Sequence, residues 1–257
     1  MHDLTFWLVA VAAVFMVGIS KSGLVSSMGL IAVPLLTLVM PARDAAGMML
    51  PLLLVMDAIA IWTYRRDANW NILKIMIPGA MVGTIVGWVL WTVVTDAVVN
   101  LLVGVISIAF VLWALSPLAK KVVNAHPSRP LGAFWGGVAG FTSFISHAGG
   151  PPYQLYVLPQ RLSPVIYSGT TAFFFGIVNV SKLIPYGFLG QLNLSNLTAA
   201  AFLAPVAVAG VLVGVALVRR ISVTFFYYLA YAMVFVLGLK LIYDGVTGIF
   251  FSGVVAA

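Results

Sequence analysis

The sequence has 257 residues, of which 63% are hydrophobic and only 7% are charged. Because soluble domains carry about 25% charged residues, this composition excludes a soluble globular enzyme, a disordered chain and a secreted disulfide scaffold. The absence of cysteine excludes disulfides, iron–sulfur clusters and thiolate metal sites. The net charge of +7 does not indicate a nucleic-acid partner. The basic residues lie in short loops between apolar stretches, as the positive-inside rule predicts for a protein of the lipid bilayer.

The apolar stretches are continuous rather than alternating, which predicts membrane-spanning helices and not a β-barrel. In chain order they are 5–19, 24–40, 45–64, 75–93, 98–117, 131–144, 152–160, 165–184, 196–218 and 223–243. Six of them have the roughly 20 residues that a full membrane crossing requires. The four shorter ones form two pairs, and polar, glycine-containing breaks separate the members of each pair, at 20–29 and 142–152.

An internal repeat relates the two halves of the chain. A shift of 122 residues places Gly18 on Gly140 and Asp57 on Asn179. The further matches are Gly47 with Gly169, Asn71 with Asn193 and, after a five-residue insertion, Gly83 with Gly210 and Gly87 with Gly214. The segment pattern matches throughout, which indicates two copies of one structural unit.

We therefore divide the chain into a first membrane repeat, 1–118, a cytoplasmic linker, 119–130, and a second repeat with a C-terminal tail, 131–257. Loops rich in Lys and Arg mark the cytoplasmic side. If each broken pair enters and leaves on one side, both termini lie outside and the halves have opposite orientation. Arg43 is an exception to this rule, because its loop would lie on the outer side of the membrane. We expect an all-α polytopic membrane protein with two inverted-topology repeats, each containing a broken helical hairpin and three transmembrane helices.

The two breaks are the predicted binding site. Non-helical backbone at membrane depth persists only where it is buried in protein or lines a cavity. Helix N-termini and free backbone N–H groups at such breaks attract anions. The candidate substrate-binding residues are Lys21, Ser22, Ser26, Ser146, His147, Gly149, Gly150, Asn179 and Lys182.

Each candidate also has a structural interpretation. Lys21 and Lys182 either bind substrate or extend their ammonium groups to the nearest membrane interface. His147 either donates to an anion and titrates near neutral pH, or is satisfied by a backbone carbonyl. Asp57 is a candidate ion- or proton-coupling residue, as is His147; alternatively it pairs with Lys21 or caps a neighbour as a neutral carboxyl. The serines of the breaks are either ligands or small packing residues.

No pattern in the chain indicates catalysis or a cofactor. A P-loop, an H-E-x-x-H motif and a pair of histidines with metal-ligand spacing are all missing from the sequence. We expect no enzyme activity, no metal and no cofactor. The four-residue spacing of Gly79, Gly83 and Gly87 predicts close packing between helices of the chain or, alternatively, a homodimer interface.

Several motifs together resemble one family of permeases. They are Gly18-Ile19-Ser20-Lys21-Ser22-Gly23 with Val33-Pro34-Leu35-Leu36, His147-Ala148-Gly149-Gly150-Pro151-Pro152, Leu158-Pro159-Gln160-Arg161-Leu162, Gly169-Thr170 and Asn179-Val180-Ser181-Lys182-Leu183-Ile184-Pro185-Tyr186. They resemble the sulfite exporter TauE/SafE family over nearly the whole chain. Ser26-Ser27-Met28-Gly29 departs from the glycine-rich run common in that family's first repeat, which hinders backbone approach there.

The resemblance implies a secondary-active transporter of the bacterial inner membrane for small sulfur-containing anions such as sulfite, sulfonates or sulfoacetate. Coupling to H⁺ or Na⁺ and alternating access are expected. Two lysines, a histidine and free backbone amides agree with an oxyanion, bound near the midplane between the two broken hairpins. The alternative is a passive channel or facilitator for a small neutral or cationic solute, centred on Asp57.

Overall fold

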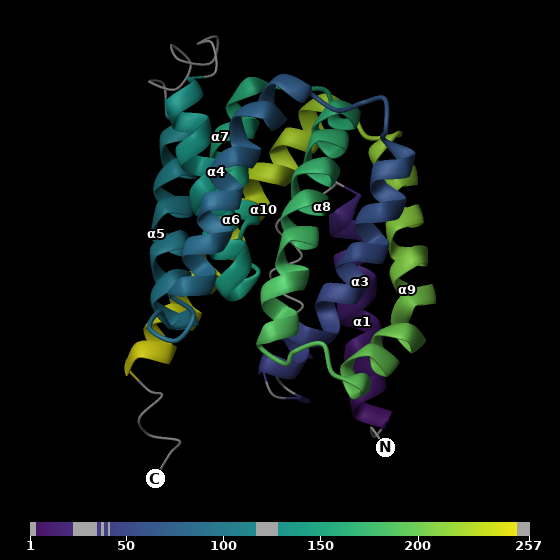
Figure 1. Ribbon diagram of the computed structural model, residues 1–257. Coiled ribbons are helices and arrows are strands. Elements are labelled where there is room, and N and C mark those ends of the chain that lie inside the picture. The colour runs from purple at the N-terminus through teal and green to yellow at the C-terminus, as the bar shows by residue number, and fades with distance from the viewer. Residues whose placement is uncertain (1–3, 23–34, 37–38, 41, 117–127, 251–257) are drawn as a thin grey trace. The chain divides into compact units, whose positions relative to one another are not determined.

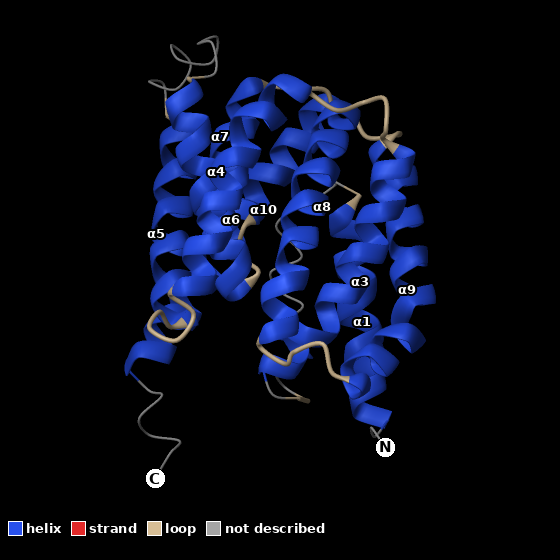
Figure 2. Ribbon diagram, viewed as in Figure 1, coloured by secondary structure: helices blue, strands red, loops and turns tan. Residues whose placement is uncertain are grey.

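The computed structural model describes residues 4–22, 35–36, 39–40, 42–116 and 128–250. Every regular element within these residues is helical, as the composition predicts (Figure 2). Seven helices of the described part are long and apolar enough to cross a membrane. The chain is therefore a multi-pass helical membrane protein.

The elements follow the chain in the order shown in Figure 1. They are α1 (Leu4–Lys21), α3 (Ala42–Thr63), α4 (Trp70–Val89), α5 (Asp96–Leu115), α6 (Arg129–Ser146), α7 (Gly150–Val157), the 3-10 turn η3 (Leu158–Gln160), α8 (Pro164–Phe188), α9 (Leu194–Val218) and α10 (Val223–Phe250). All but α6, α7 and η3 qualify as membrane spans. The six predicted full crossings therefore have long helices, and the first short stretch forms an 18-residue helix, α1.

Polar side chains fix the starts of three spans. Asn69 accepts hydrogen bonds from the backbone N–H groups of the first turn of α4. Ser163 accepts one from Ile166 at the start of α8, and Asn193 accepts one from Asn196 at the start of α9. Such caps satisfy donors that have no partner inside the helix, at a gain of about 1 kcal/mol each.

The second break lies at residues 147–149, inside the wider segment that the sequence indicates. Helix α6 ends at Ser146, and His147 adopts the left-handed conformation with φ of 53°. The Ala148 N–H then bonds back to the Thr142 carbonyl at 3.1 Å, which closes the helix end. Helix α7 restarts at Gly150 with two prolines in its first turn, where a helix needs no N–H. Most of the first break, residues 23–29, lies outside the described residues.

The chain forms two compact units. The first consists of Met1–Leu73 and Ser163–Phe226, and the second of Lys74–Leu162 and Tyr227–Ala257. Each unit combines segments from before and after the predicted linker. The predicted sequence repeats and the compact units are therefore different divisions of the chain.

In the first unit, α1 packs against α9, and α3 packs against both α8 and α9. Helices α3 and α8 run antiparallel (Figure 1). Gly47 near the start of α3 lies against Gln191, just beyond α8, and Tyr64 at the end of α3 lies against Gly169 near the start of α8. Helix α3 thus pairs with α8 and, near its own start, with the turn that follows α8.

In the second unit, glycines bring α4 and α6 into backbone contact. A Cβ on Gly79 would overlap the Ala133 carbonyl, and one on Gly83 would overlap the Gly137 carbonyl. From the other side, a Cβ on Gly140 would overlap the Ala80 carbonyl. The expectation that these glycines pack inside the chain is confirmed.

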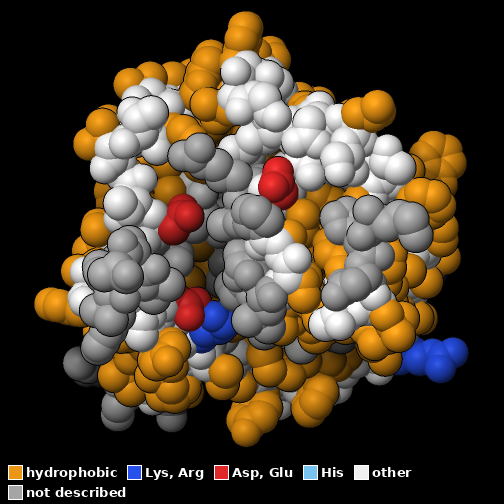
Figure 3. Space-filling model, turned by 90° about the horizontal axis from the view of Figure 1, so that it is seen from below, with side chains coloured by type: hydrophobic (Ala, Val, Ile, Leu, Met, Phe, Trp, Pro, Cys, Tyr) orange, Lys and Arg blue, Asp and Glu red, His pale blue; other side chains and the backbone are white. Residues whose placement is uncertain are grey.

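The outward side chains of the spans are largely apolar, as contact with lipid requires. Large hydrophobic residues are exposed along every long helix, including Leu4, Val82, Leu102 and Phe202. Figure 3 views the helices end on, and in this view hydrophobic side chains gather around the rim while the few acidic and basic groups are scattered. A lipid environment makes this exposure favourable.

Candidate functional site

The predicted site residues divide between the two units. The first unit holds Lys21, Ser22, Asp57, Asn179 and Lys182. The second holds Ser146, His147, Gly149 and Gly150, all at the break between α6 and α7. Ser26 lies outside the described residues.

A hydrogen-bonded ion pair forms the centre of the first group. The Lys21 ammonium, on the last residue of α1, donates to Oδ1 of Asp57 at 2.7 Å. The Asn179 amide of α8 donates to the other carboxylate oxygen, Oδ2, at 2.6 Å. One carboxylate on α3 therefore holds donors from two other helices. Pairing with Lys21 is one of the interpretations that the sequence left open for Asp57.

The position of Asp57 explains why it needs both donors. It lies about two turns before the end of α3, and its side chain is only 3% exposed. A buried carboxylate without a partner costs several kcal/mol, whereas a paired and hydrogen-bonded one is tolerated.

Lys182 completes this group, which we call the lysine–carboxylate cluster: Lys21, Asp57, Asn179 and Lys182. Lys182 is fully buried on α8, three residues after Asn179. It lies close enough to Lys21 and Asp57 for the charges of both to act on it. Among the described residues, the cluster thus contains two lysines and one carboxylate.

Sequence reasoning missed two residues at the cluster. The Phe175 ring lies 5.4 Å from the Lys21 nitrogen, within the range of a cation–π contact. A Cβ on Gly176 would lie 2.6 Å from the Ile61 side chain and 3.6 Å from the Asp57 Cβ, so this glycine lets α8 approach α3. The spacing of Phe175 to Asn179 and Lys182, i to i+4 and i+7, places all three on one helix face and was the available signal.

Ser22 has a local packing role in the structure. Its side chain is fully buried, and its hydroxyl donates to the Ile19 carbonyl at 2.6 Å. It also lies against Gly214 of α9, where any larger residue would collide with it. Ser22 thus contributes to the close contact of α1 with α9.

Local hydrogen bonds hold the second break. The Thr142 hydroxyl donates to the Ala148 carbonyl at 3.2 Å, and the Ala148 N–H donates to the Thr142 carbonyl at 3.1 Å. Gly149 and Gly150 are buried, and His147 is partly exposed. The backbone of the break is thereby fixed between two helix ends.

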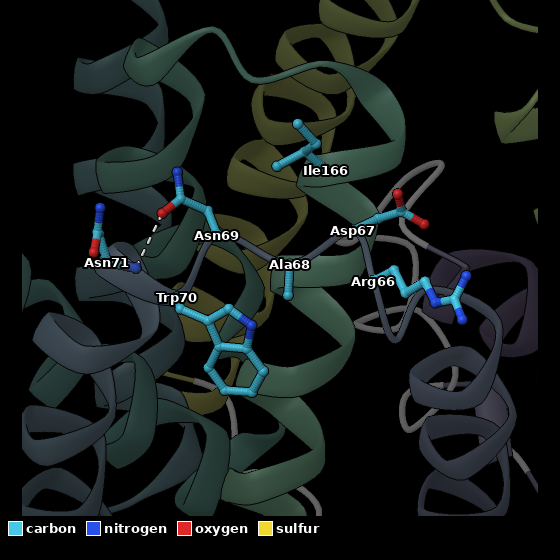
Figure 4. Close-up of a pocket in the computed structure, with 7 residues that line it drawn as sticks. All are labelled: Arg66, Asp67, Ala68, Asn69, Trp70, Asn71 and Ile166. Carbon is cyan, nitrogen blue, oxygen red and sulfur yellow. Dashed lines mark hydrogen bonds between the residues drawn. The ribbon is translucent and has the colours of Figure 1, made fainter.

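A separate surface pocket of about 370 Å³ lies at the turn between α3 and α4 (Figure 4). It is lined by Arg66, Asp67, Ala68, Asn69, Trp70, Asn71 and Ile166. The Asn69 side chain in this pocket accepts from the Asn71 N–H at 3.1 Å and so is engaged in capping α4. None of the predicted site residues lines this pocket. Within the described residues, no group of His, Asp and Glu side chains could hold a metal ion.

Long apolar helices and a lysine–carboxylate cluster buried between them define a polytopic membrane protein with ionisable groups inside its spans. Such groups in membrane proteins mark substrate or ion pathways. Comparison with protein families gives a match to the family described as "Sulfite exporter TauE/SafE" over residues 10–241. The chain therefore belongs to this family of membrane transporters, and the resemblance predicted from its motifs is confirmed. No curated protein and no solved structure matches the chain.

Proposed function

We propose that the chain is a secondary-active permease for small sulfur-containing anions, such as sulfite, sulfonates or sulfoacetate. The observation that carries this proposal is the lysine–carboxylate cluster between α1, α3 and α8. Its ammonium and amide donors suit an anion with several acceptor oxygens, and charge-assisted hydrogen bonds of this kind are strong. The family membership supports the same class of substrate.

The state of Asp57 favours an anion over a cation. Both of its oxygens already accept hydrogen bonds, from Lys21 and Asn179. A cationic solute would have to displace one of these donors and would then meet two lysines. The alternative of a cation channel centred on Asp57 is therefore disfavoured, and the experiment below tests it as well.

The packing of the first unit supports an inverted repeat. Helices α3 and α8 are equivalent under the 122-residue shift, yet they run antiparallel. Asp57 and Asn179, also 122 residues apart, touch each other directly. Equivalent residues meet in this way on a pseudo-two-fold axis in the membrane plane, which is a common design of transporters.

The helix crossings support the same arrangement. Gly18 of α1 lies against Gly210 of α9. Under the repeat, α1 is equivalent to α6 and α9 is equivalent to α4. Helices α6 and α4 also cross closely, because Gly83 lies against Gly137. We infer alternating access, in which the two inverted repeats move relative to each other. The protein would lie in the bacterial inner membrane with both termini outside. We also propose Ser146, His147, Gly149 and Gly150 as anion ligands near the midplane.

Thermal stabilisation of the purified protein by a panel of anions tests the proposal. Sulfite, sulfate, thiosulfate, taurine, sulfoacetate, phosphate and carboxylates are compared. A ligand at a hundred times its Kd adds about 2.7 kcal/mol to stability. We expect a selective shift with a sulfur-containing anion, which Lys21→Ala and Lys182→Ala remove.

Lys240→Ala is the matched control, because Lys240 pairs with Asp244 on α10 rather than with the cluster. It should keep the wild-type response. Wild-type affinity in both cluster variants would overturn the assignment of the site. A response to cations alone would favour the channel.

A further inference from the structure

The ion pair at the cluster is unequally accessible. The Lys21 side chain is 14% exposed, whereas that of Asp57 is 3% exposed. A solute that reaches the pair therefore meets Lys21 first. Asp57 occupies one side of the ammonium at 2.7 Å, and the Phe175 ring lies on another at 5.4 Å. Asp57 thus serves as the internal counter-ion of Lys21.

An arriving anion must share Lys21 with this internal anion. Two negative charges on one ammonium lie within a few ångströms of each other, and at low dielectric their repulsion is large. One of the two must then be displaced or neutralised. Sulfonates and sulfate are anions of strong acids and do not accept a proton near neutral pH. Of the two anions, the carboxylate is the stronger base.

We propose that Asp57 couples anion binding to protons, so that each anion bound at Lys21 is accompanied by one proton taken up by the Asp57 carboxylate. This inference rests on the proposed function and adds the coupling ion to it. The proton comes from water on the side from which the anion arrives and bonds to one carboxylate oxygen. The carboxylate becomes a neutral carboxylic acid, and the lysine keeps its proton and pairs with the anion.

The proposed step is balanced in charge. A monoanion adds one negative charge to the cluster, and the proton adds one positive charge. The buried cluster therefore keeps the same net charge before and after loading. The Asn179 amide remains available to the second carboxylate oxygen throughout.

The other titratable groups near Asp57 are few. Lys21 faces it from α1, and Lys182 acts on it from α8. Helix α9, which also packs on α3, has no titratable residue between Leu194 and Val218. The segment 23–41 contains none in its sequence. Among the described residues of the first unit that pack around Asp57, Lys182 is thus the one competing proton acceptor, and variants of Asp57 separate the two.

Proton uptake during anion binding tests the inference. The purified protein in weakly buffered detergent solution is mixed with methanesulfonate, a monoanion whose charge is constant between pH 5 and 8, and a pH indicator reports the protons. We expect one proton per bound anion in the wild type. The apparent Kd should increase about tenfold for each unit by which the pH is raised, since one proton is linked to each anion.

Asp57→Asn should bind the anion without proton uptake and with a Kd that does not depend on pH. Asp57→Glu retains a titratable carboxylate and should retain the uptake. Asp44→Asn is the matched control, because it makes the same substitution near the start of the same helix, and should behave as the wild type.

Each outcome decides a different question. Failure of every anion to bind the wild type would overturn the proposed function. Binding without proton uptake would overturn the coupling alone and leave an anion permease. Proton uptake that persists in Asp57→Asn would mean that another group accepts the proton. If Asp57→Asn does not fold, the pH dependence of the wild-type Kd still decides whether a proton is coupled.

Discussion

Asp57 joins three helices through two carboxylate oxygens, so its partners are not interchangeable with ordinary surface charges. Lys21 supplies the positive charge from α1, and Asn179 supplies a neutral donor from α8. Without the positive charge of Lys21, the buried Asp57 carboxylate keeps only the Asn179 amide as a partner. Removal of both charges takes away the uncompensated carboxylate and leaves only the Asn179 amide without its acceptor, which costs less than an unpaired buried charge.

A double-mutant cycle measures this difference. We expect Lys21→Met to lower the free energy of unfolding by about 3–5 kcal/mol, because it leaves Asp57 buried without its cation. The double variant Lys21→Met/Asp57→Leu should recover much of that loss. Denaturant unfolding in detergent provides the measurement, with tryptophan fluorescence as the signal.

The pair on α10 is the control for this cycle. Lys240 and Asp244 are 32% and 26% exposed and four residues apart on one helix. Exposed pairs of this type contribute less than about 1 kcal/mol, so Lys240→Met should change stability little. Equal losses in Lys21→Met and Lys240→Met would contradict a special role for the buried pair.

The members of the cluster were predictable at this scale, but their contacts were not. Lys21, Asp57, Asn179 and Lys182 each interrupt an apolar stretch, which is a strong signal in a membrane sequence. Which oxygen accepts from which donor depends on how closely three helices approach. Phe175 does not interrupt an apolar stretch, so only its helical spacing to Asn179 and Lys182 could have indicated it.

At the scale of elements, the crossing of α4 and α6 depends on the missing side chains of glycines. Gly83→Ala places a methyl group on the Gly137 carbonyl. We expect a loss of about 1–3 kcal/mol, because the backbones must separate to relieve the overlap. Thermal unfolding of the purified variant measures it.

Gly137→Ala is the matched control on the facing helix. Its added Cβ would find no atom nearer than 3.5 Å, which is ordinary van der Waals contact. It should leave stability unchanged or raise it by up to about 1 kcal/mol, since alanine favours a helix over glycine. A Gly137→Ala variant as unstable as Gly83→Ala would mean that the crossing is not packed as described.

The sequence located the break after α6 but made it too wide. Thr142 and Ser146 are polar, and polarity at membrane depth suggests non-helical backbone. In the structure their hydroxyls bond to carbonyls one turn back on the same helix, so both residues remain helical. Similarly, Lys240 and Asp244 pair along α10, which continues to Phe250, beyond the apolar stretch. Helix ends depend on these local bonds rather than on polarity alone.

At the scale of the whole molecule, the compact units cross the boundary between the predicted repeats. The glycine pattern predicts that α4 packs closely on another helix, but four-residue spacing carries no information about which one. The partner is α6, from after the linker. Likewise α3 packs on α8 rather than within the first half. These long-range choices depend on the combined surfaces of several helices, which no local pattern encodes.

The proposed inversion makes a prediction that this chain is well suited to test, because it contains no cysteine. A single cysteine then reports its own side of the membrane through a membrane-impermeant maleimide. Asn71 at the start of α4 is equivalent to Asn193, which caps α9. Leu194→Cys, beside that cap, spares the capping bond, and both Asn71 and Leu194 are exposed.

In an inverted repeat, equivalent positions lie on opposite sides of the membrane. We expect Leu194→Cys to be labelled in intact cells and Asn71→Cys only after the membrane is permeabilised. Labelling of both from the same side would mean a parallel repeat. The antiparallel contact of α3 with α8 would then need another origin, because two equivalent spans of a parallel repeat run in the same direction. The labelling pattern therefore tests the topology independently of any substrate.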